Sequence, residues 1–363
     1  MKLVVFGLAV SSSWGNGHAT LWRALCKGLA RRGHQVTFFE RDAPWYREAR
    51  DFAGQPGLET VIYPDWPAVR AEAARAVRGS DAAIVTSYCP DGVDAARLVQ
   101  ETPGPSVRAF YDLDTPVTLE RLGAGDRPDY LPPEGLGGFD LVLSYTGGAA
   151  LERLRTELGA RRTAPLYGSV DPDLHRPVAA QGSGRRFDLS YLGTWAADRQ
   201  AVLERLFIQP ARALPAHRFA IAGAQYPRDF PWTANIFFLR HMPPVDHPGF
   251  FAASRLTLNV TRRAMAECGW CPSGRLFEAA ACGTPLLSDA WEGLGDFFRP
   301  GEEILIARDA GEAIDAVTLE DGALRRIAAR ARERTLAEHG CDRRAAELEA
   351  LLEGAVAAVT QEA

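Results

Sequence analysis

Short apolar runs alternate with longer amphipathic stretches along the whole chain, and this alternation limits the possible folds more than any other feature. Runs that are apolar throughout are typical of strands buried on both faces of a parallel sheet. Strands are expected near residues 2–10, 35–40, 58–62, 82–88, 106–111 and 139–145, and again near 187–193, 217–222, 235–240, 255–260, 284–288 and 303–307. Strands that alternate with helices form βαβ units, so we expect an α/β protein with two mostly parallel sheets in tandem.

The amphipathic stretches between these runs predict the helices that cover the two sheets. Helices are expected near residues 18–32, 91–100, 147–158, 198–213, 273–282, 309–318, 321–338 and 341–359. Gly33 directly follows the first of them and is a typical helix stop.

A stretch rich in Pro and Gly, residues 164–186, interrupts the alternation. Such stretches mark domain boundaries, and 363 residues are enough for two domains. The expected division is an N-terminal domain over 1–167, a linker over 168–186, a C-terminal domain over 187–340 and a C-terminal helix over 341–363. That last helix could pack back on the N-terminal domain.

The composition excludes several classes of partner. Lys and Arg number 41 against 46 Asp and Glu, so the basic face that nucleic acid requires is not expected. The apolar run 3–10 follows Met1 without a basic segment and is far shorter than the roughly 20 residues of a membrane span. Six cysteines in a chain of this length do not make a disulfide scaffold. We therefore expect a cytoplasmic protein without a transmembrane segment; the oligomeric state stays open.

The loop SSSWGNGHAT, residues 11–20, follows the first expected strand. Ligands of open parallel sheets bind beyond the carboxyl ends of the strands, which makes this loop a candidate site. Gly15 and Gly17 allow a tight turn on either side of Asn16. His18 falls at the start of the next helix, where its imidazole could act as a general base or could merely cap or line the loop. The loop lacks the third glycine of a dinucleotide-binding fingerprint.

The segment CPSGRLFEAAACGTPLLSD, residues 271–289, has the features of a phosphate-binding helix. Ser273 can cap the helix, and Gly274 lets an anion approach the backbone N–H groups. Arg275 adds a positive charge in the first turn, so we expect a diphosphate site here. Glu278 follows among small apolar residues, where a carboxylate needs a partner. The hydroxyls of a sugar diol would provide one; an Arg from a neighbouring element is the alternative.

A third candidate loop is LGTWAADRQ, residues 192–200, after the first strand of the second half. Gly193 and Thr194 offer a close backbone approach, and Arg199 lies at the start of the next helix, as suits phosphate. Arg199 could equally pair with Asp198.

Several of these stretches resemble one known family. Residues 273–305, SGRLFEAAACGTPLLSDAWEGLGDFFRPGEEIL, strongly resemble the C-terminal half of GT-B glycosyltransferases, especially the spore-maturation-protein CgeB-like group. The segments GSVDPDLHRP, LGTWAADR and RLTLNVTR fall where that group has equivalents, and GNGHAT is more loosely similar to the glycine-rich first loop of such enzymes. The resemblance covers most of the second half and the first half mainly by layout.

The resemblance implies two Rossmann-like domains that face a central cleft, with a nucleoside-diphosphate sugar held mostly by the C-terminal domain and the acceptor by the N-terminal one. Glu278 is then the carboxylate on the donor ribose. Ser273, Gly274 and Arg275 would meet the diphosphate, and we also assign Arg262, the last residue of RLTLNVTR, to the donor site. The loop residues on the acceptor side are Gly15, Asn16 and Gly17. The donor, with a UDP-sugar favoured, is a co-substrate and no other cofactor is expected; the acceptor is a small molecule, a lipid or a glycan.

One position departs from the family pattern. Retaining members carry a second Glu eight positions before the ribose Glu, where this chain has Trp270; Glu267 is nearby but out of register. The departure favours inversion of the sugar carbon. The resemblance further implies a metal-independent enzyme, because GT-B enzymes generally use helix ends and basic side chains in place of a divalent ion.

An inverting enzyme needs a base that deprotonates the acceptor as it attacks. His18 is the first candidate, and Asp112 and Asp114 in FYDLDTPVTLERL are the others. Either Asp could instead cap the helix expected to start near Thr115.

Other features carry less weight. Cys268 and Cys271 have metal-ligand or redox spacing, but no second pair completes a zinc site. His241 and His247 bracket MPPVD, and the sequence suggests no ligand partner for either. Four tryptophans near loops could stack on sugar or base but more commonly serve packing: Trp14, Trp195, Trp232 and Trp270.

Two other functions fit the same pattern. A nucleotide-sugar epimerase would keep the donor site but need an acid/base pair around the sugar and no acceptor pocket. A non-catalytic nucleotide-sugar-binding protein would have lost the base, and His18 with the two aspartates argues against that.

Overall fold

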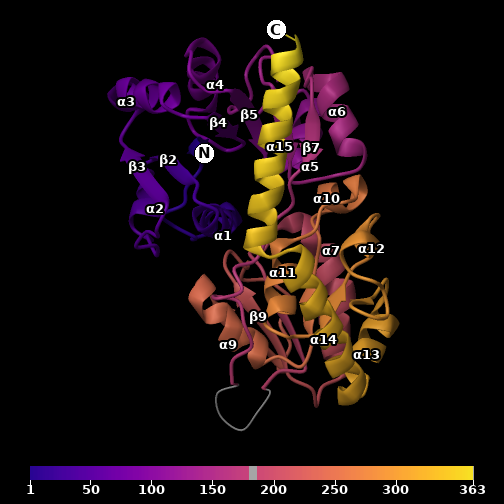
Figure 1. Ribbon diagram of the computed structural model, residues 1–363. Coiled ribbons are helices and arrows are strands. Elements are labelled where there is room, and N and C mark those ends of the chain that lie inside the picture. Colours follow the sequence, from indigo (N-terminus) through magenta and orange to yellow (C-terminus); the bar gives the residue numbers. More distant parts are fainter. Residues whose placement is uncertain (180–185, 363) are drawn as a thin grey trace. The chain divides into compact units, whose positions relative to one another are not determined.

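The computed structural model describes residues 1–179 and 186–362. The chain forms two compact units, one of Met1–Ser169 with Cys341–Ala363 and one of Val170–Gly340 (Figure 1). Residues 180–185 of the expected linker and Ala363 of the expected last helix lie outside the described residues. Each unit is an α/β structure built on a parallel sheet, so the predicted fold class is confirmed.

The first unit contains a seven-stranded sheet in the order β3-β2-β1-β4-β5-β6-β7. Its strands are β1 (Lys2–Gly7), β2 (Gln35–Arg41), β3 (Leu58–Tyr63), β4 (Ala82–Thr86), β5 (Val107–Asp112), β6 (Leu141–Ser144) and β7 (Thr163–Pro165). The first six lie where the sequence predicts them. The strand order reverses between β1 and β4, and ligands of open parallel sheets commonly bind beyond the carboxyl ends of the strands at such a reversal.

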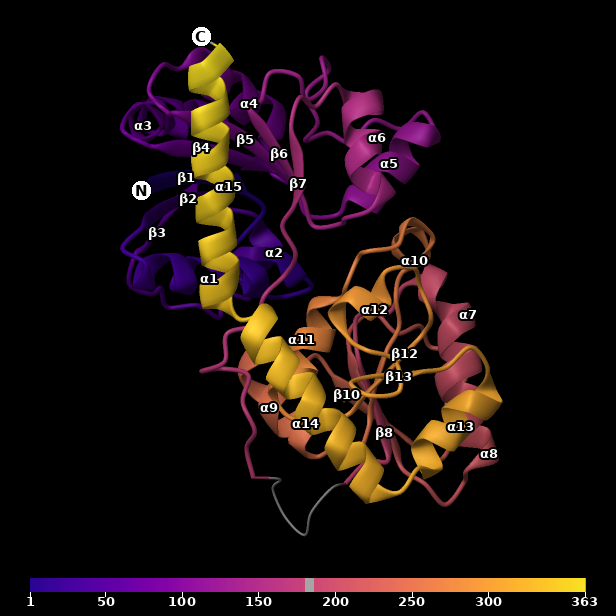
Figure 2. The same cartoon turned by 45° about the vertical axis from the view of Figure 1, so that its right-hand side comes forward.

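Seven helices accompany this sheet within its described residues. They are α1 (Gly17–Arg31), α2 (Pro44–Arg47), α3 (Trp66–Arg78), α4 (Gly92–Glu101), α5 (Thr115–Gly123), α6 (Ala149–Leu158) and α15 (Cys341–Glu362). The helix α15 closes the first unit by packing against α1 (Figures 1 and 2). A Cβ at Gly28 would lie 2.3 Å from the carbonyl oxygen of Cys341, so only glycine permits this approach. Arg32 Nε also donates to Glu349 Oε2 at 2.7 Å.

The second unit contains a six-stranded sheet in the order β10-β9-β8-β11-β12-β13. Its strands are β8 (Leu189–Leu192), β9 (Phe219–Gly223), β10 (Ile236–Arg240), β11 (Thr257–Asn259), β12 (Leu286–Ser288) and β13 (Leu305–Ile306). The order reverses between β8 and β11, which is the corresponding place for a ligand in this sheet.

The helices of the second unit include one irregular run. Its regular helices are α9 (His247–Ala252), α10 (Arg263–Cys268), α11 (Gly274–Ala281), α12 (Leu294–Phe297), α13 (Ala310–Thr318) and α14 (Asp321–Glu338). The helix expected over 198–213 is a chain of short pieces: a 3₁₀ turn at Ala197–Arg199, α7 (Gln200–Leu203), a π-helical stretch at Glu204–Ile208 and α8 (Gln209–Ala213). Pro210 has no N–H to donate to the preceding turn, which accounts for the interruption.

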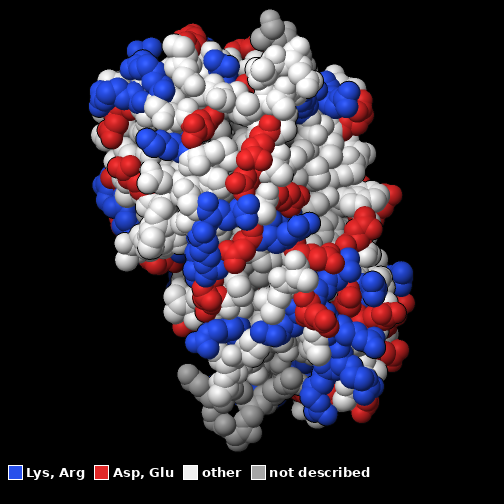
Figure 3. Space-filling view, viewed as in Figure 1, with Lys and Arg blue, Asp and Glu red and all other residues white. Residues whose placement is uncertain are grey.

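Two surface features bear on the expected partners. Within the described residues no helix is both long and apolar enough to cross a membrane. Basic and acidic side chains lie interspersed over the face shown in Figure 3.

Candidate functional site

A buried glutamate fixes the loop that follows β1. Glu40, at the end of β2, accepts hydrogen bonds from the backbone N–H groups of Val10 at 2.7 Å and Ser11 at 2.9 Å. The turn that follows has Gly15 at φ +61°, a conformation that favours glycine, as the sequence predicts. Asn16 then caps α1, because its Oδ1 accepts from the His18 N–H at 3.0 Å. The loop is thus rigidly held and delivers His18 in the first turn of α1.

Two of the three predicted bases lie together in the first unit. His18 Nε2 is 3.6 Å from Asp114 Oδ2, and the two side chains are 17% and 19% exposed. Asp114 occupies the N-cap position of α5, but its side chain makes no capping hydrogen bond. The capping role considered for this residue is therefore wrong. The ring of Tyr88 packs edge-on against the imidazole with centroids 5.5 Å apart.

The third candidate, Asp112, is the last residue of β5 and is fully buried. Its Oδ1 accepts the N–H of Asp114 at 3.1 Å, so it shapes the turn that carries Asp114. Burial raises the pKa of Asp112 to about 6, against the opposing effect of hydrogen bonds from Thr118 and the Asp114 backbone. Asp112 is thus a carboxyl group that can exchange a proton near neutrality, but it has no access to solvent.

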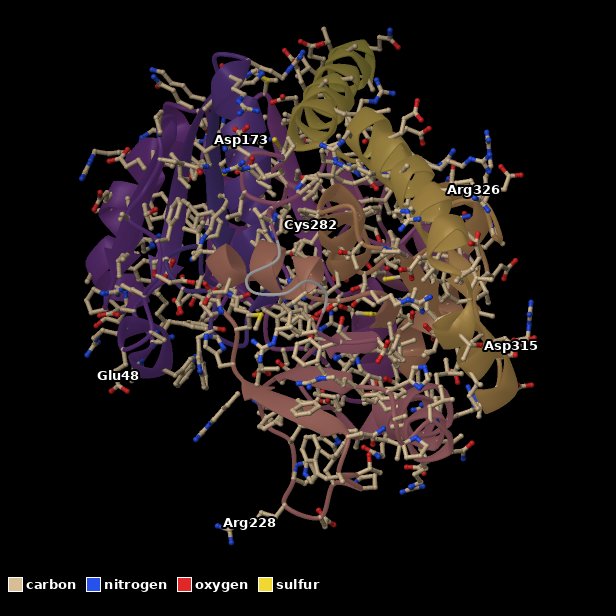
Figure 4. All side chains as sticks on the ribbon, turned by 90° about the horizontal axis from the view of Figure 1, so that it is seen from below. Glu48, Asp173, Arg228, Cys282, Asp315 and Arg326 are labelled. Atoms are coloured by element: carbon tan, nitrogen blue, oxygen red, sulfur yellow. The ribbon has the colours of Figure 1, made fainter. Side chains whose placement is uncertain are left out.

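The amino end of α11 in the second unit has the predicted local structure. The helix begins at Gly274, and the Ser273 Oγ accepts the Arg275 N–H at 3.3 Å as its cap. Figure 4 marks Cys282, which directly follows the helix at its other end. The Arg275 side chain is 34% exposed, so its charge is open to a ligand.

Glu278 lies one turn further along α11 and is buried. Its Oε2 contacts Arg275 Nη1, and His247 Nδ1 lies 3.0 Å from the same oxygen. His175 Nε2 is 3.8 Å away. Burial by itself would raise the pKa of the Glu278 carboxyl, but Arg275 and the two histidines outweigh it and hold the pKa well below its usual range. The Arg partner considered for Glu278 therefore exists, although it comes from the same helix and not from a neighbouring one.

The two histidines are the site residues that the sequence did not identify. The expectation that His247 has no partner is wrong, since it is the first residue of α9 and contacts Glu278. His175 follows Asp173, which Figure 4 labels, and is 1% exposed. Burial lowers the pKa of both imidazoles. A buried carboxylate signals that partners exist, but nothing local in the sequence says which residues they are.

The loop after β8 is held in a different way from the one expected. The close approach in this loop depends on Gly223, where a Cβ would lie only 2.0 Å from the Gly193 carbonyl oxygen. Arg199 Nη1 donates to the Thr194 carbonyl at 3.0 Å. Asp198, considered as the partner of Arg199, lies 3.2 Å from Arg262 Nε. Arg262 is thus paired with a carboxylate in this structure.

Trp270 occupies a left-handed turn between α10 and α11, with φ +43°. Its Nε1 donates to Asp296 Oδ2 at 2.6 Å, and its ring lies so close to Gly293 that a Cβ there would meet it at 2.6 Å. Glu267 is 65% exposed and faces Arg263 at 3.9 Å. Trp270 is thus held by Asp296 and Gly293, and Glu267 lies on the exposed side of α10.

One group of side chains has the composition of a metal site. Among the described residues, His175, His247 and Glu278 are the only cluster of at least three His, Cys, Asp or Glu whose ligand atoms lie within 4.8 Å of one another. Cys268 and Cys271 do not belong to it.

Comparisons with known proteins agree with this architecture. Residues 199–350 match the family model described as glycosyl transferase-like. No curated protein matches the chain in sequence. The structure is similar to sucrose-phosphate synthase from Thermosynechococcus elongatus, with a TM-score of 0.71, 16% identity and coverage of 98% of this chain and 99% of that one. It is also similar to HepE of Anabaena in complex with UDP and glucose, with a TM-score of 0.67, 13% identity and coverage of 98% and 100%.

A third similar structure is an alpha-glucosyltransferase in complex with UDP-glucose and DNA, with a TM-score of 0.67, 11% identity and coverage of 97% of this chain and 98% of that one. At such identities the likeness concerns the fold. Residues 199–350 thus match a glycosyl transferase-like family, and the two parallel-sheet units have the GT-B fold of these similar structures.

Proposed function

We propose that this protein transfers a sugar from a UDP-sugar to a hydroxyl of a small-molecule, lipid or glycan acceptor, with inversion at the sugar carbon and without a metal ion. Two similar structures carry UDP with glucose and UDP-glucose, which supports this class of donor. The observation that carries the proposal is the amino end of α11, where a serine cap, an accessible arginine and a buried ionised glutamate occur within six residues (SGRLFE).

In the proposed donor complex the diphosphate binds at the N-terminus of α11. The backbone N–H of Gly274, the helix dipole and Arg275 all favour an anion there. As the bond between the sugar and UDP breaks, negative charge builds up on the diphosphate, and these same groups stabilise it. No divalent ion is needed for that charge. Gly193, Thr194 and Arg199 complete the proposed phosphate surroundings from the loop after β8.

The proposed role of Glu278 is to accept hydrogen bonds from the ribose hydroxyls. Its low pKa keeps the group ionised and therefore an acceptor only. Charged acceptors make the stronger hydrogen bonds, so a ribose diol gains more here than at a neutral amide.

The proposed base is His18, assisted by Asp114. The acceptor hydroxyl gives its proton to the imidazole as its oxygen attacks the sugar carbon from the side opposite UDP. Asp114, 3.6 Å from the ring, stabilises the imidazolium that forms. Gly15, Asn16 and Gly17 would line the acceptor side of this loop.

The reducing cytoplasm is the proposed compartment. All six cysteines are free thiols.

The test of the donor site is nucleotide binding. A thermal-shift panel of nucleotides should raise the melting temperature with UDP and UDP-sugars. Glu278→Ala should weaken UDP binding by roughly tenfold or more, as loss of a charged hydrogen bond does. Unchanged affinity in this variant would refute the ribose assignment, and a panel in which no nucleotide binds would refute the transferase proposal.

The test of stereochemistry is the anomeric configuration of the product, followed by proton NMR from an alpha-linked UDP-sugar. An alpha-linked product would refute inversion. A change in the donor sugar without any acceptor would favour an epimerase instead.

A further inference from the structure

The oxygen Glu278 Oε2 sits in a network that a donor site alone does not explain. Arg275 contacts it from the same helix, His247 Nδ1 lies 3.0 Å away at the start of α9, and His175 Nε2 is 3.8 Å away. Both histidines are 1% exposed. Neither can be a surface residue that happens to pass near the carboxylate.

Both ring nitrogens of His247 face groups that only accept hydrogen bonds. Its Nδ1 faces the Glu278 carboxylate and its Nε2 faces the Met242 carbonyl at 3.3 Å, and both of these groups are acceptors only. A neutral imidazole has a single N–H and can serve only one of them at a time. Arg275 Nη1 is also 3.3 Å from His247 Nδ1 and can donate a hydrogen bond to that nitrogen when it carries no proton. The proton arrangement of His247 is therefore tied to the position of Arg275.

His175 adds a second candidate donor. Among the described residues neither of its ring nitrogens has a hydrogen-bond partner, although the ring is buried. A buried polar group without a partner is costly, so one is expected to form in some state of the molecule. Glu278 Oε2, at 3.8 Å from Nε2, is the charged acceptor facing it.

A metal ion is the alternative reading of these three side chains, since two His and one Glu match a zinc ligand set. The guanidinium of Arg275 already contacts the same carboxylate oxygen, however. A dication bound there would be repelled by Arg275 at close range. The charge at this oxygen is already balanced by the protein itself.

This inference rests on the proposed function. If the donor binds as proposed, Arg275 faces both the Glu278 carboxylate and the diphosphate. Its side chain is partly exposed and belongs to the turn that would meet the diphosphate. Engaging the diphosphate draws the guanidinium away from Glu278. The carboxylate must then hold its position for the ribose with other donors.

We propose that His247 is a positioning residue for the donor ribose: its Nδ1–H holds the Glu278 carboxylate in place while Arg275 is engaged by the diphosphate, with His175 as the second donor. His247 touches neither ribose nor phosphate. Its effect reaches the nucleotide through Glu278 alone, so it acts on recognition of the ribose hydroxyls and not on the phosphates or the base.

The test compares the affinities of the full-length protein for UDP and 2′-deoxy-UDP by isothermal titration calorimetry. The wild type should prefer UDP by roughly tenfold, the value of one hydrogen bond to a charged group. In His247→Leu the ratio of the affinities for UDP and 2′-deoxy-UDP should fall close to one. His247→Gln keeps an N–H donor and should retain most of it. His217→Leu, the same substitution at a histidine before β9 with no hydrogen bond from its Nδ1 among the described residues, is the matched control and should leave the preference unchanged.

The ratio of two affinities in one variant is insensitive to a fraction of misfolded protein, which lowers both equally. The inference would be overturned if His247→Leu kept the wild-type preference for UDP over 2′-deoxy-UDP. It would also be overturned if His247→Gln lost that preference to the same extent as His247→Leu. Wild-type protein that binds neither nucleotide would instead refute the proposed function. If Glu278→Gln loses the preference while the His247 variants keep it, the donor site stands and only the role of His247 is wrong.

Zn²⁺ added without nucleotide should leave the melting temperature unchanged, and a rise that requires His247 would favour the metal site over the positioning role.

Discussion

Replacing Asp112 by Asn should stabilise the first unit at neutral pH. The carboxyl lies at the end of β5, fully buried, and burial raises its pKa to about 6 from an ordinary value of about 3.9. Between these two values the folded state holds a proton that the unfolded state has already lost. The contribution of this group is therefore most favourable below about pH 4 and is lost as the pH rises through 6.

The size of the effect follows from the same two values. Each tenfold difference in proton affinity corresponds to 1.36 kcal/mol, so ionising Asp112 in the fold costs ~3 kcal/mol at pH 7. Asparagine keeps an oxygen that can accept the Asp114 N–H and carries no charge. A change of ~3 kcal/mol corresponds to a rise in melting temperature of roughly 6 to 12 °C for a unit of this size.

The assay is differential scanning calorimetry of wild type and Asp112→Asn from pH 4 to pH 8, following the transition of the first unit. The difference should be near zero at pH 4 and should reach its full value above pH 7. Asp129→Asn, at an exposed position between α5 and β6, is the matched control and should show no pH-dependent gain. A difference that is independent of pH, or a variant less stable than wild type at pH 7, would refute this account of Asp112.

Three further predictions concern catalysis, metal dependence and the closing helix. His18→Ala and Asp114→Asn should each lower kcat by roughly 10²-fold or more, and the double variant should lose little beyond His18→Ala because the two act as one unit; additive losses would contradict this. Dialysis against EDTA should leave transfer activity within about twofold of the untreated enzyme, and a loss restored by Mg²⁺ or Mn²⁺ would contradict metal-independent transfer. Gly28→Val should force α15 away from α1 and destabilise the first unit by about 1–3 kcal/mol, seen as a lower melting temperature and faster proteolysis of α15; wild-type behaviour would show that the close approach at Cys341 is not needed.

The strands were predictable because most of them are short apolar runs flanked by polar residues on both sides. β4 (AAIVT) and β9 (FAIAG) are buried at every position, so their residue type alone fixes their place. β7 was missed because it has only three residues, ends in Pro165 and overlaps the Pro- and Gly-rich stretch of residues 164–186. It forms because β6 offers it an edge to pair with, which is information from the fold and not from the segment.

Helix ends were predictable where a single residue decides them. Ser273 before Gly274 signals a cap that the structure contains, whereas Asn16, expected only as a loop residue, caps α1. The irregular interior of the helical run over 197–213 was not predictable, because its sequence pattern is amphipathic throughout. The π-helical stretch depends on how the turn before Pro210 is accommodated.

The site was predictable only within each loop. The helix cap, the charge of Arg275 and the unsatisfied carboxylate of Glu278 all follow from neighbouring residues in the chain. The contacts of Glu278 with His247 and of His18 with Asp114 join distant segments that no local pattern connects. The sequence named His18 and Asp114 as rival bases, and only the geometry makes them partners.

The return of α15 to the first unit makes that unit discontinuous in the chain, with Val170–Gly340 inserted between its two parts. The ends of the inserted unit are adjacent, since Val170 N–H donates to the His339 carbonyl at 2.9 Å and Val170 pairs with Gly340. During synthesis the inserted unit can complete its sheet and leave the ribosome while the first unit still lacks the helix that covers α1. The first sheet therefore stays partly uncovered until α15 has been synthesised. The first unit is complete only once α15 docks on α1, and before that step its uncovered surface is open to a chaperone or a protease.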